Sequence, residues 1–393
     1  MNAKCYKVIF SKRLGSLVPV GEHATSSGKA AAGQSCRGMV FPCSLLAAFR
    51  NRLVNTLRFS VVSVALACFT IANTQAQSSR VSVATTALPT GFTTGTGTTS
   101  VNTHGAQMAI TQTSDKASIN WQSFNVGTGA SVNIAQPSTS AILLNRVVGN
   151  DPSQILGKLS ANGQVILLNP NGILFGKDGS VTASTFTAST FGLSDADFMS
   201  GYYKYNRNGS TATIVNEGTI ETTAGGFVAL IGASVSNDGK IIAHQGNVVL
   251  AAAESVTLPD SMALAHPPST TGISIPLSKK VRLELLPASV NAAIENTPNG
   301  VIVTEGGQVL LQAAAISSAV ASIMHSGSID TSGAQGGAVQ VLAENGKIKI
   351  DGSIKANSSG NDSHDQALKG GDIIIGRDEQ TGALAKATDV SGA

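Results

Sequence analysis

The sequence predicts an all-β protein folded as a right-handed parallel β-helix. Aromatic residues make up 4% of the chain, charged residues make up 12%, and 42 of the 393 residues are glycine. This composition suits many short strands joined by tight turns better than a helical bundle. A repeat of about twenty residues in the later part of the chain indicates a solenoid. A tight turn at residues 163–176 lies between two apolar runs that are too short for helices.

The first 76 residues have the composition of a targeting segment. They contain nine Lys or Arg and one Asp or Glu, whereas residues 77–393 contain 17 and 22. The uncharged apolar run Phe59–Ala72 is too short to span a bilayer comfortably, but it has the length of a signal-peptide core. Small residues at Thr74 and Ala76 predict cleavage between Ala76 and Gln77. The alternative is a signal anchor that stays attached.

The cysteines and the charge of the remaining chain exclude several functions. All four cysteines lie in the leader, at Cys5, Cys36, Cys43 and Cys68. The predicted mature chain therefore forms no disulfide in the oxidising periplasm, and it has no thiol for a zinc site or a nucleophile. Its acidic balance argues against nucleic acid as a partner.

The elements expected after the leader begin with a β cap. Residues Asn102–Gln122 alternate Thr, Ile and Asn and include the chain's single Trp, so we expect cap strands that cover the first coil. The tetrapeptide Asn169–Gly172 follows as a tight turn, in which Pro170 presets φ, Asn171 tolerates a left-handed φ and Gly172 accepts what remains. Its Asn side chains are expected to satisfy backbone groups inside the turn. An ordinary hairpin or corner is the alternative.

The pattern Asn-x-Gly-x-Ile, then Gly-x-Val-x-Leu, recurs after this turn. Copies begin 21 residues apart at Asn216 and Asn237, and weaker copies begin at Asn299 and Gly327. Such a unit buries its apolar face only by stacking on its neighbours, which gives about twelve to fifteen coils for the chain after the leader. A β-sandwich is the alternative fold, but it does not predict a steady spacing.

Two stretches interrupt the repeat. Ser194–Ser210 is polar and aromatic and is expected to be a surface excursion. Pro259–Pro287 contains five prolines, which are too many for central strands, so it is expected to leave the coil as a loop or a small edge ribbon.

Three motifs surround the tight turn in a fixed order: Asn145-Arg146-Val147, Asn169-Pro170-Asn171-Gly172 and Ser194-Asp195-Ala196-Asp197-Phe198. In this order they resemble the N-terminal secretion domain of filamentous-haemagglutinin-like exoproteins, the exported half of bacterial two-partner secretion systems. The family's second short motif, Asn-Pro-Asn-Leu, is absent here. The region before the hydrophobic run resembles the extended signal peptide of large exported proteins of Gram-negative bacteria. The resemblance implies the same β-helix.

The resemblance also implies a route and partners. The chain would pass the Sec translocon and then an outer-membrane transporter with periplasmic polypeptide-transport domains, and would be secreted or displayed at the cell surface. The implied transporter-recognition residues are Asn145, Arg146 and the turn Asn169–Gly172. Arg146 is expected to be an exposed charge for an acidic patch on the transporter, and a solvated surface Arg is the alternative. A monomer that contacts a glycan or protein on a host or neighbouring cell is expected.

The predicted organisation has five parts. These are a cleaved leader at 1–76, a two-partner secretion domain at 77–255, a Pro-rich excursion at 256–290, further β-helix coils at 291–378 and a flexible C-terminal end at 379–393.

No pattern in the mature chain indicates catalysis, a metal or a cofactor. Asp195 and Asp197 are the closest carboxylate pair, and turn or cap roles are favoured over acid–base work. Each His is expected on the surface without a metal-ligand partner: His104, His244, His266, His325 and His364. We predict a non-enzymatic, adhesin-like exoprotein. The alternatives are a haemolysin or contact-dependent toxin carrier truncated before its effector, and a β-helical polysaccharide-degrading enzyme.

Overall fold

A computed structural model gives the structure of the chain in two separate units, residues 1–80 and 81–393. In the first unit, β1 (Tyr6–Ser11) and β2 (Ser16–Gly21) form an antiparallel hairpin. The predicted signal-peptide core and cleavage site lie outside the described residues. The described residues are 6–11, 16–21, 82–259, 281–285, 287, 292–315, 321–361, 370–376, 384–385 and 387–390.

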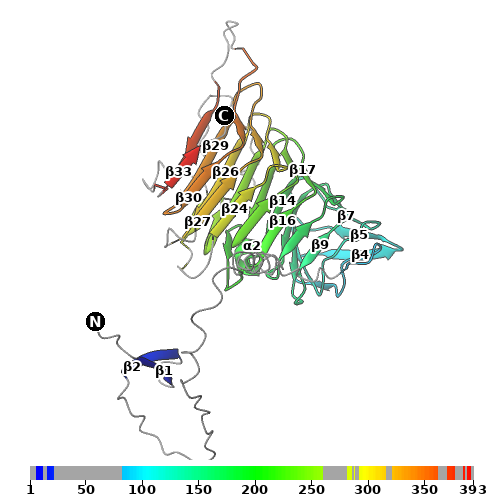
Figure 1. Cartoon of the computed structure of the whole chain (residues 1–393). Coiled ribbons are helices and arrows are strands. Elements are labelled where there is room, and N and C mark those ends of the chain that lie inside the picture. The colour runs from blue at the N-terminus through cyan, green and yellow to red at the C-terminus, as the bar shows by residue number, and fades with distance from the viewer. Residues whose placement is uncertain are drawn as a thin grey trace, which may run out of the picture. The chain divides into compact units, whose positions relative to one another are not determined.

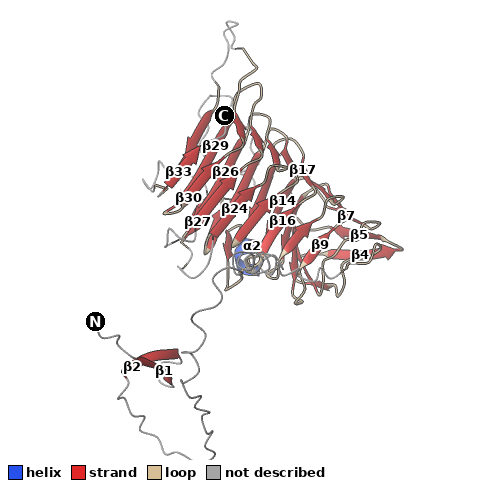
Figure 2. Cartoon of the chain, viewed as in Figure 1, coloured by secondary structure: helices blue, strands red, loops and turns tan. Residues whose placement is uncertain are grey.

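The second unit is a parallel β-helix built from three sheets, S1, S2 and S3, which the chain visits in the order S3, S1, S2 in each coil (Figures 1 and 2). S1 contains, in spatial order, β4 (Thr99–His104), β5 (Gln107–Gln112), β7 (Ser131–Ala135), β10 (Lys158–Ala161), β13 (Ser180–Ala183), β17 (Thr219–Thr222), β20 (Lys240–Ala243), β25 (Val301–Val303), β28 (Ser328–Asp330) and β31 (Ser353–Lys355).

S2 contains β3 (Thr93–Thr94), β6 (Lys116–Trp121), β8 (Ile142–Val147), β11 (Gln164–Leu168), β14 (Thr185–Ser189), β18 (Phe227–Ile231), β21 (Asn247–Ala252), β26 (Gln308–Ala314), β29 (Ala338–Glu344) and β32 (Asp372–Ile375). S3 contains β9 (Ser153–Ile155), β12 (Ile173–Phe175), β16 (Thr213–Asn216), β19 (Ser234–Asn237), β24 (Ala292–Asn296), β27 (Ala321–His325), β30 (Lys347–Ile350) and β33 (Ala387–Val390). The predicted all-β parallel β-helix is confirmed.

The core runs along the axis of the helix as columns of stacked apolar side chains. On each S1 strand, alternate residues point inward because successive side chains of a strand face opposite sides. One column runs in register through seven strands, and all its members are buried: Val132, Leu159, Val181, Ile220, Ile241, Ile302 and Ile329. The core cluster extends from Met108 to Ile350, so it is continuous across the boundary predicted at residue 255.

The predicted N-terminal cap is present at the start of the helix. The strands β4 and β3 pair antiparallel with β5 and β6, whereas β5 and β6 pair parallel with the next coil. The ring of Trp121 closes this end, with its centroid 5.7 Å from that of Phe92 and 5.6 Å from that of Phe124.

The excursion predicted at Ser194–Ser210 is present, and the stretch 191–206 within it and just before it forms an apolar cover on the outer face of S2. S2 strands such as β11 and β18 are buried at every position, so their outer face also needs an apolar covering. The helix α2 (Asp195–Ser200) and the strand β15 (Tyr203–Asn206) supply it, together with β22 (Ser255–Leu258). The buried side chains of the cover include Phe191, Leu193, Phe198, Tyr203 and Tyr205.

The Pro-rich stretch forms an edge ribbon where it is described. The strand β22 pairs antiparallel with β15 on one side and with β23 (Arg282–Glu284) on the other. This confirms the ribbon, while residues 260–280 lie outside the described part of the chain.

The number of coils is lower than the repeat length predicts. Among the described residues, S2 has nine parallel strands, β6 to β32, where twelve to fifteen coils were expected, because the cover and the ribbon use residues that would otherwise build coils. The strand β33 lies inside the segment 379–393 and pairs with β30, and the repeat pattern missed it.

Candidate functional site

The turn Asn169–Gly172 joins β11 of S2 to β12 of S3. Gly172 N–H donates to Asn169 O at 3.1 Å, which closes a four-residue turn. Gly172 has a φ of +119°, and the positive-φ residues do not include Asn171. The left-handed φ that Asn171 could tolerate is therefore not used, and the position that needs glycine is Gly172.

Asn169 is fully buried, and its carboxamide uses all of its hydrogen-bonding capacity. Its Nδ2 donates to Asp151 O and to Ser153 Oγ, both at 2.9 Å. Its Oδ1 accepts from the Asn171 N–H at 2.9 Å and from Asn171 Nδ2 at 3.2 Å. Asn169 thus fastens the turn to the loop that leads into β9, the neighbouring strand in S3.

The exposed half of the turn is tied to two different segments. Asn171 Nδ2 donates to Gly149 O at 2.9 Å, in the loop after β8. Ser210 Oγ donates to Pro170 O at 2.7 Å, in the segment that follows the cover. The turn therefore lies where the first coils meet the chain that returns from the cover.

Asn145 and Arg146 point to opposite faces of β8. Asn145 is fully buried in the core, where its Oδ1 accepts from Trp121 Nε1 at 3.1 Å. Arg146 lies on the outer face, and its Nη2 donates to Asp195 Oδ1 and to Leu193 O, both at 2.8 Å. The guanidinium is partly exposed but is paired within the molecule, so it is not the free charge expected for Arg146.

The helix α2 is anchored at both ends. Ser194 is its N-cap: its Oγ accepts from the Asp197 N–H at 3.0 Å and donates to Asp197 Oδ2 at 2.7 Å. Asp197 therefore has the predicted cap role, while Asp195 lies in the first turn of the helix and pairs with Arg146. At the other end, Lys116 Nζ donates to Phe198 O at 3.2 Å and to Met199 O at 3.1 Å. Sequence reasoning missed Lys116, which lies 82 residues before its partner.

Together these contacts join the three sequence motifs into one cluster. Arg146 of the first motif binds Asp195 of the third motif. The second motif binds the loop after β8 and the segment that follows the cover. The motifs are distant in sequence and lie on neighbouring coils because each coil returns to the same sheet.

Of two described histidines, His244 keeps the expected surface position and His325 does not. His244 is half-exposed, and its Nε2 and Nδ1 lie 2.9 Å from Glu221 Oε1 and 3.0 Å from Glu305 Oε1. The hydrogen bond to Glu221 is the main cause that raises the pKa of His244. His325 is fully buried, and burial lowers its pKa.

His325 ends a ladder of buried amides at the last positions of four S3 strands. Asn216 Nδ2 donates to Asn237 Oδ1, and Asn237 Nδ2 donates to Asn296 Oδ1, both at 2.7 Å. Asn296 Nδ2 lies 3.1 Å from His325 Nδ1. The residue in register with Asn237 is thus Asn296 and not Asn299, which the repeat pattern selected.

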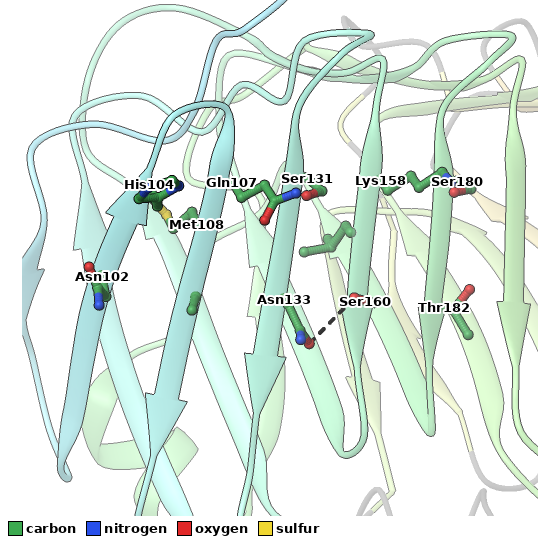
Figure 3. A pocket seen from close by; sticks show the side chains of 12 residues that line it. Asn102, His104, Gln107, Met108, Ser131, Asn133, Lys158, Ser160, Ser180 and Thr182 are labelled. Carbon is green, nitrogen blue, oxygen red and sulfur yellow. Dashed lines mark hydrogen bonds between the residues drawn. The ribbon is translucent and has the colours of Figure 1, made fainter.

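A hollow of about 470 Å³ lies on the outer face of S1 across β4, β5, β7, β10 and β13 (Figure 3). Amide and hydroxyl groups line it together with one Lys, one His and the apolar residues Met108, Ala109 and Leu159, and its lining contains no carboxylate. The labelled side chains make one mutual hydrogen bond, Ser160 Oγ to Asn133 Oδ1 at 3.5 Å. The polar lining residues are Asn102, His104, Gln107, Ser131, Asn133, Lys158, Ser160, Ser180 and Thr182.

The part of the chain that the structure describes contains neither a metal-binding cluster nor a membrane-spanning helix. No group of three or more His, Cys, Asp and Glu residues there is arranged to hold a metal ion. No helix in the same part of the chain is long and apolar enough to cross a membrane.

Comparison with known proteins gives two family matches. Residues 85–361 match the family described as TPS secretion domain. Residues 1–49 match the extended signal peptide of type V secretion systems. The HMW1 secretion domain from Haemophilus influenzae has a similar solved structure, with 26% identity, a TM-score of 0.56 and coverage of 77% of this chain and 84% of that one.

Two curated relatives carry the name heme/hemopexin-binding protein, both from Haemophilus influenzae. One is 33% identical over 177 residues, which is 43% of this chain and 20% of the relative. The other is 38% identical over 112 residues, which is 28% of this chain and 12% of the relative. The matched regions thus span a fifth or less of the relatives' length.

Proposed function

The chain belongs to the TPS secretion domain family, the exported half of two-partner secretion systems, and from this we propose that its outer-membrane transporter recognises the first coils around Asn169–Gly172. The extended signal peptide and the secretion domain direct such a chain through Sec to secretion or surface display. The proposal concerns the residues that the transporter reads and the surface that the secreted protein presents.

One observation carries the proposal: the buried Asn169 side chain makes four hydrogen bonds, two inside the turn and two that join it to the loop at 149–153. Loss of this side chain leaves buried backbone and hydroxyl groups without partners, at about 1–3 kcal/mol for each unsatisfied group. Because solenoid coils contact only their neighbours, this loosens the first coils and spares the later ones. We infer that Asn169 and Asn145 act by maintaining the conformation of this region. The exposed residues Pro170 and Asn171 are contacted directly by the transporter.

The test is secretion of single variants with the cognate transporter. Asn169→Ala, Asn171→Ala and Arg146→Ala are each expected to lower the extracellular share of the protein and to raise the periplasmic share. Asn133→Ala is the matched control, since Asn133 is exposed on the outer face of S1 and its side chain makes only a 3.5 Å contact. Export of both Asn169 and Asn171 variants at the level of this control would refute the role of the turn.

For the secreted protein we propose a non-enzymatic, adhesin-like role as a monomer without nucleic acid, with the S1 hollow as its contact surface. Its amide and hydroxyl groups suit hydroxyl-rich partners such as cell-surface glycans. The relatives are named for heme and hemopexin binding, whereas the amide and hydroxyl groups of the hollow are the features that favour a glycan here. Binding of the secreted protein to cells before and after glycosidase treatment tests this. A Lys158→Ala, Asn133→Ala double variant that binds as well as wild type contradicts the assigned surface.

A further inference from the structure

The coil that returns after the ribbon is rejoined to the helix at a seam, defined here as the pairings of β20 with β25 and β21 with β26. The paired residues are about sixty positions apart in sequence, and β20 and β25 share three register pairs. Side chains reinforce this short pairing. At one corner, Asn299 Nδ2 donates to Asp238 Oδ1 at 3.1 Å, and Thr297 Oγ1 donates to the same oxygen.

At the opposite corner, three side chains from three successive coils form a chain of contacts. Glu221 lies on β17, His244 directly follows β20, and Glu305 follows β25 at the equivalent position. The imidazole lies between the two carboxylates, with one ring nitrogen at 2.9 Å from one acid and the other at 3.0 Å from the second.

We propose that His244 is a proton-dependent clip that binds the returning coil to the coils before it. An ionised carboxylate only accepts hydrogen bonds, and a neutral imidazole has only one N–H. The neutral ring therefore satisfies one acid and turns a lone pair towards the other. The imidazolium donates to both acids at once, so the full three-coil contact requires one added proton.

The charges around the ring favour this proton. Both acids raise the pKa of His244, and the hydrogen bond to Glu221 is the larger cause. On the same face of S1, Lys240 lies at the opposite end of β20, and Asp330 and Lys355 lie on the two strands beyond β25. Glu221 and Glu305 are the acids in hydrogen-bond contact with the ring.

The direction of the effect follows from the raised pKa. The clip contributes its full stability below the unfolded pKa of about 6.5, and that contribution disappears as the pH rises through the higher folded pKa. Opening at the seam separates the coils from β24 onward from those before, since stacked coils are held only by their neighbours. We therefore expect local opening of 292–314 to become more frequent at alkaline pH.

The test is hydrogen exchange by mass spectrometry on protein recovered from the culture medium, at about pH 6 and about pH 8.5, corrected for intrinsic exchange. In wild type, the rise in pH should lower the protection of β24–β26 several-fold relative to that of β10–β11. This relative fall should be less than about tenfold per pH unit because one proton is involved. In His244→Gln this relative fall should vanish. His104→Gln, which removes an exposed His on β4, should behave as wild type.

A second measurement keeps the proposal testable if the first variant is secreted poorly. In Glu305→Gln, the NMR titration midpoint of His244 should move down relative to wild type. An unchanged His244 midpoint, or a seam whose protection falls equally in wild type and His244→Gln, overturns the clip.

Discussion

Arg146 Nη2 lies 2.8 Å from Asp195 Oδ1, and this contact joins two motifs that are 49 residues apart in sequence. Both groups are partly exposed, so the ion pair alone contributes little. The same nitrogen also donates to Leu193 O, and Nη1 donates to Asn120 Oδ1 at 3.2 Å. The guanidinium therefore links a strand of the cap, a strand of the first full coil and the start of the cover.

Arg146→Ala is expected to loosen the cover without unfolding the helix. It removes three hydrogen bonds from a charged donor, with an expected loss of about 1–3 kcal/mol. Limited proteolysis should cleave the variant within 191–206 faster than wild type, at an unchanged far-ultraviolet spectrum. Lys204→Ala, which breaks a more exposed pair with Glu284 in the ribbon, serves as the control. Equal cleavage of the two variants contradicts a clamping role for Arg146.

Lys116→Met should release the other end of α2. Its ammonium caps two carbonyls of the last turn and lies 5.9 Å from the ring centroid of Phe198. Methionine keeps much of the apolar length but loses the charge, for a cost of about 1–2 kcal/mol. Thermal unfolding should begin at a lower temperature than in wild type. An unchanged unfolding curve would show that packing of Phe198 alone holds the helix.

Two glycine substitutions separate backbone strain from steric clash. At Gly172, an added Cβ meets nothing nearer than Thr213 O at 3.4 Å, so Gly172→Ala is disfavoured by its φ of +119°, at about 1–2 kcal/mol. At Gly226, whose φ is ordinary, the Cβ would lie 1.9 Å from Ser184 O, so the backbone of S2 must move. Gly226→Ala should therefore destabilise the protein more than Gly172→Ala in chemical denaturation. The reverse order would contradict the assignment of the two causes.

Val248→Asp tests whether the core is shared between coils. Val248 is fully buried, between Val228 and Val309 in register. A carboxylate there has no partner among these neighbours, and burying it unpaired costs several kcal/mol. We expect no folded protein in the medium, whereas Val248→Ala should be secreted at a reduced level.

The sequence was sufficient to predict the strands that have one buried face and one solvent-exposed face. On S1, alternation of apolar and polar residues marks the core side directly, and the Asn-Gly corners mark the period. S2 carries no such signal, because Ile166 and Leu167 point to opposite faces and both are buried. The cover over Ile166 was therefore missed, and so was the anchoring role of Lys116 and Arg146, since their partners come from a segment that only tertiary packing brings near.

The last prediction concerns the buried His325. Its Nε2 lies 3.1 Å from Ser353 O, which only accepts, so Nε2 carries the proton and Nδ1 accepts from Asn296 Nδ2. Protonation of Nδ1 would place two donors face to face. Burial lowers the pKa of His325, so its contribution to stability is complete above the unfolded pKa of about 6.5 and is lost as the pH falls through the folded pKa.

His325→Asn should remove this acid sensitivity and keep the ladder, because the amide oxygen of Asn can accept from Asn296 as Nδ1 does. The measurement is the free energy of unfolding between about pH 7.5 and pH 5, made in a His244→Gln background because His244 acts with the opposite sign. The background protein should lose stability on acidification, and the double variant should lose less of it. An equal loss in both would show that other groups, and not His325, set the acid response.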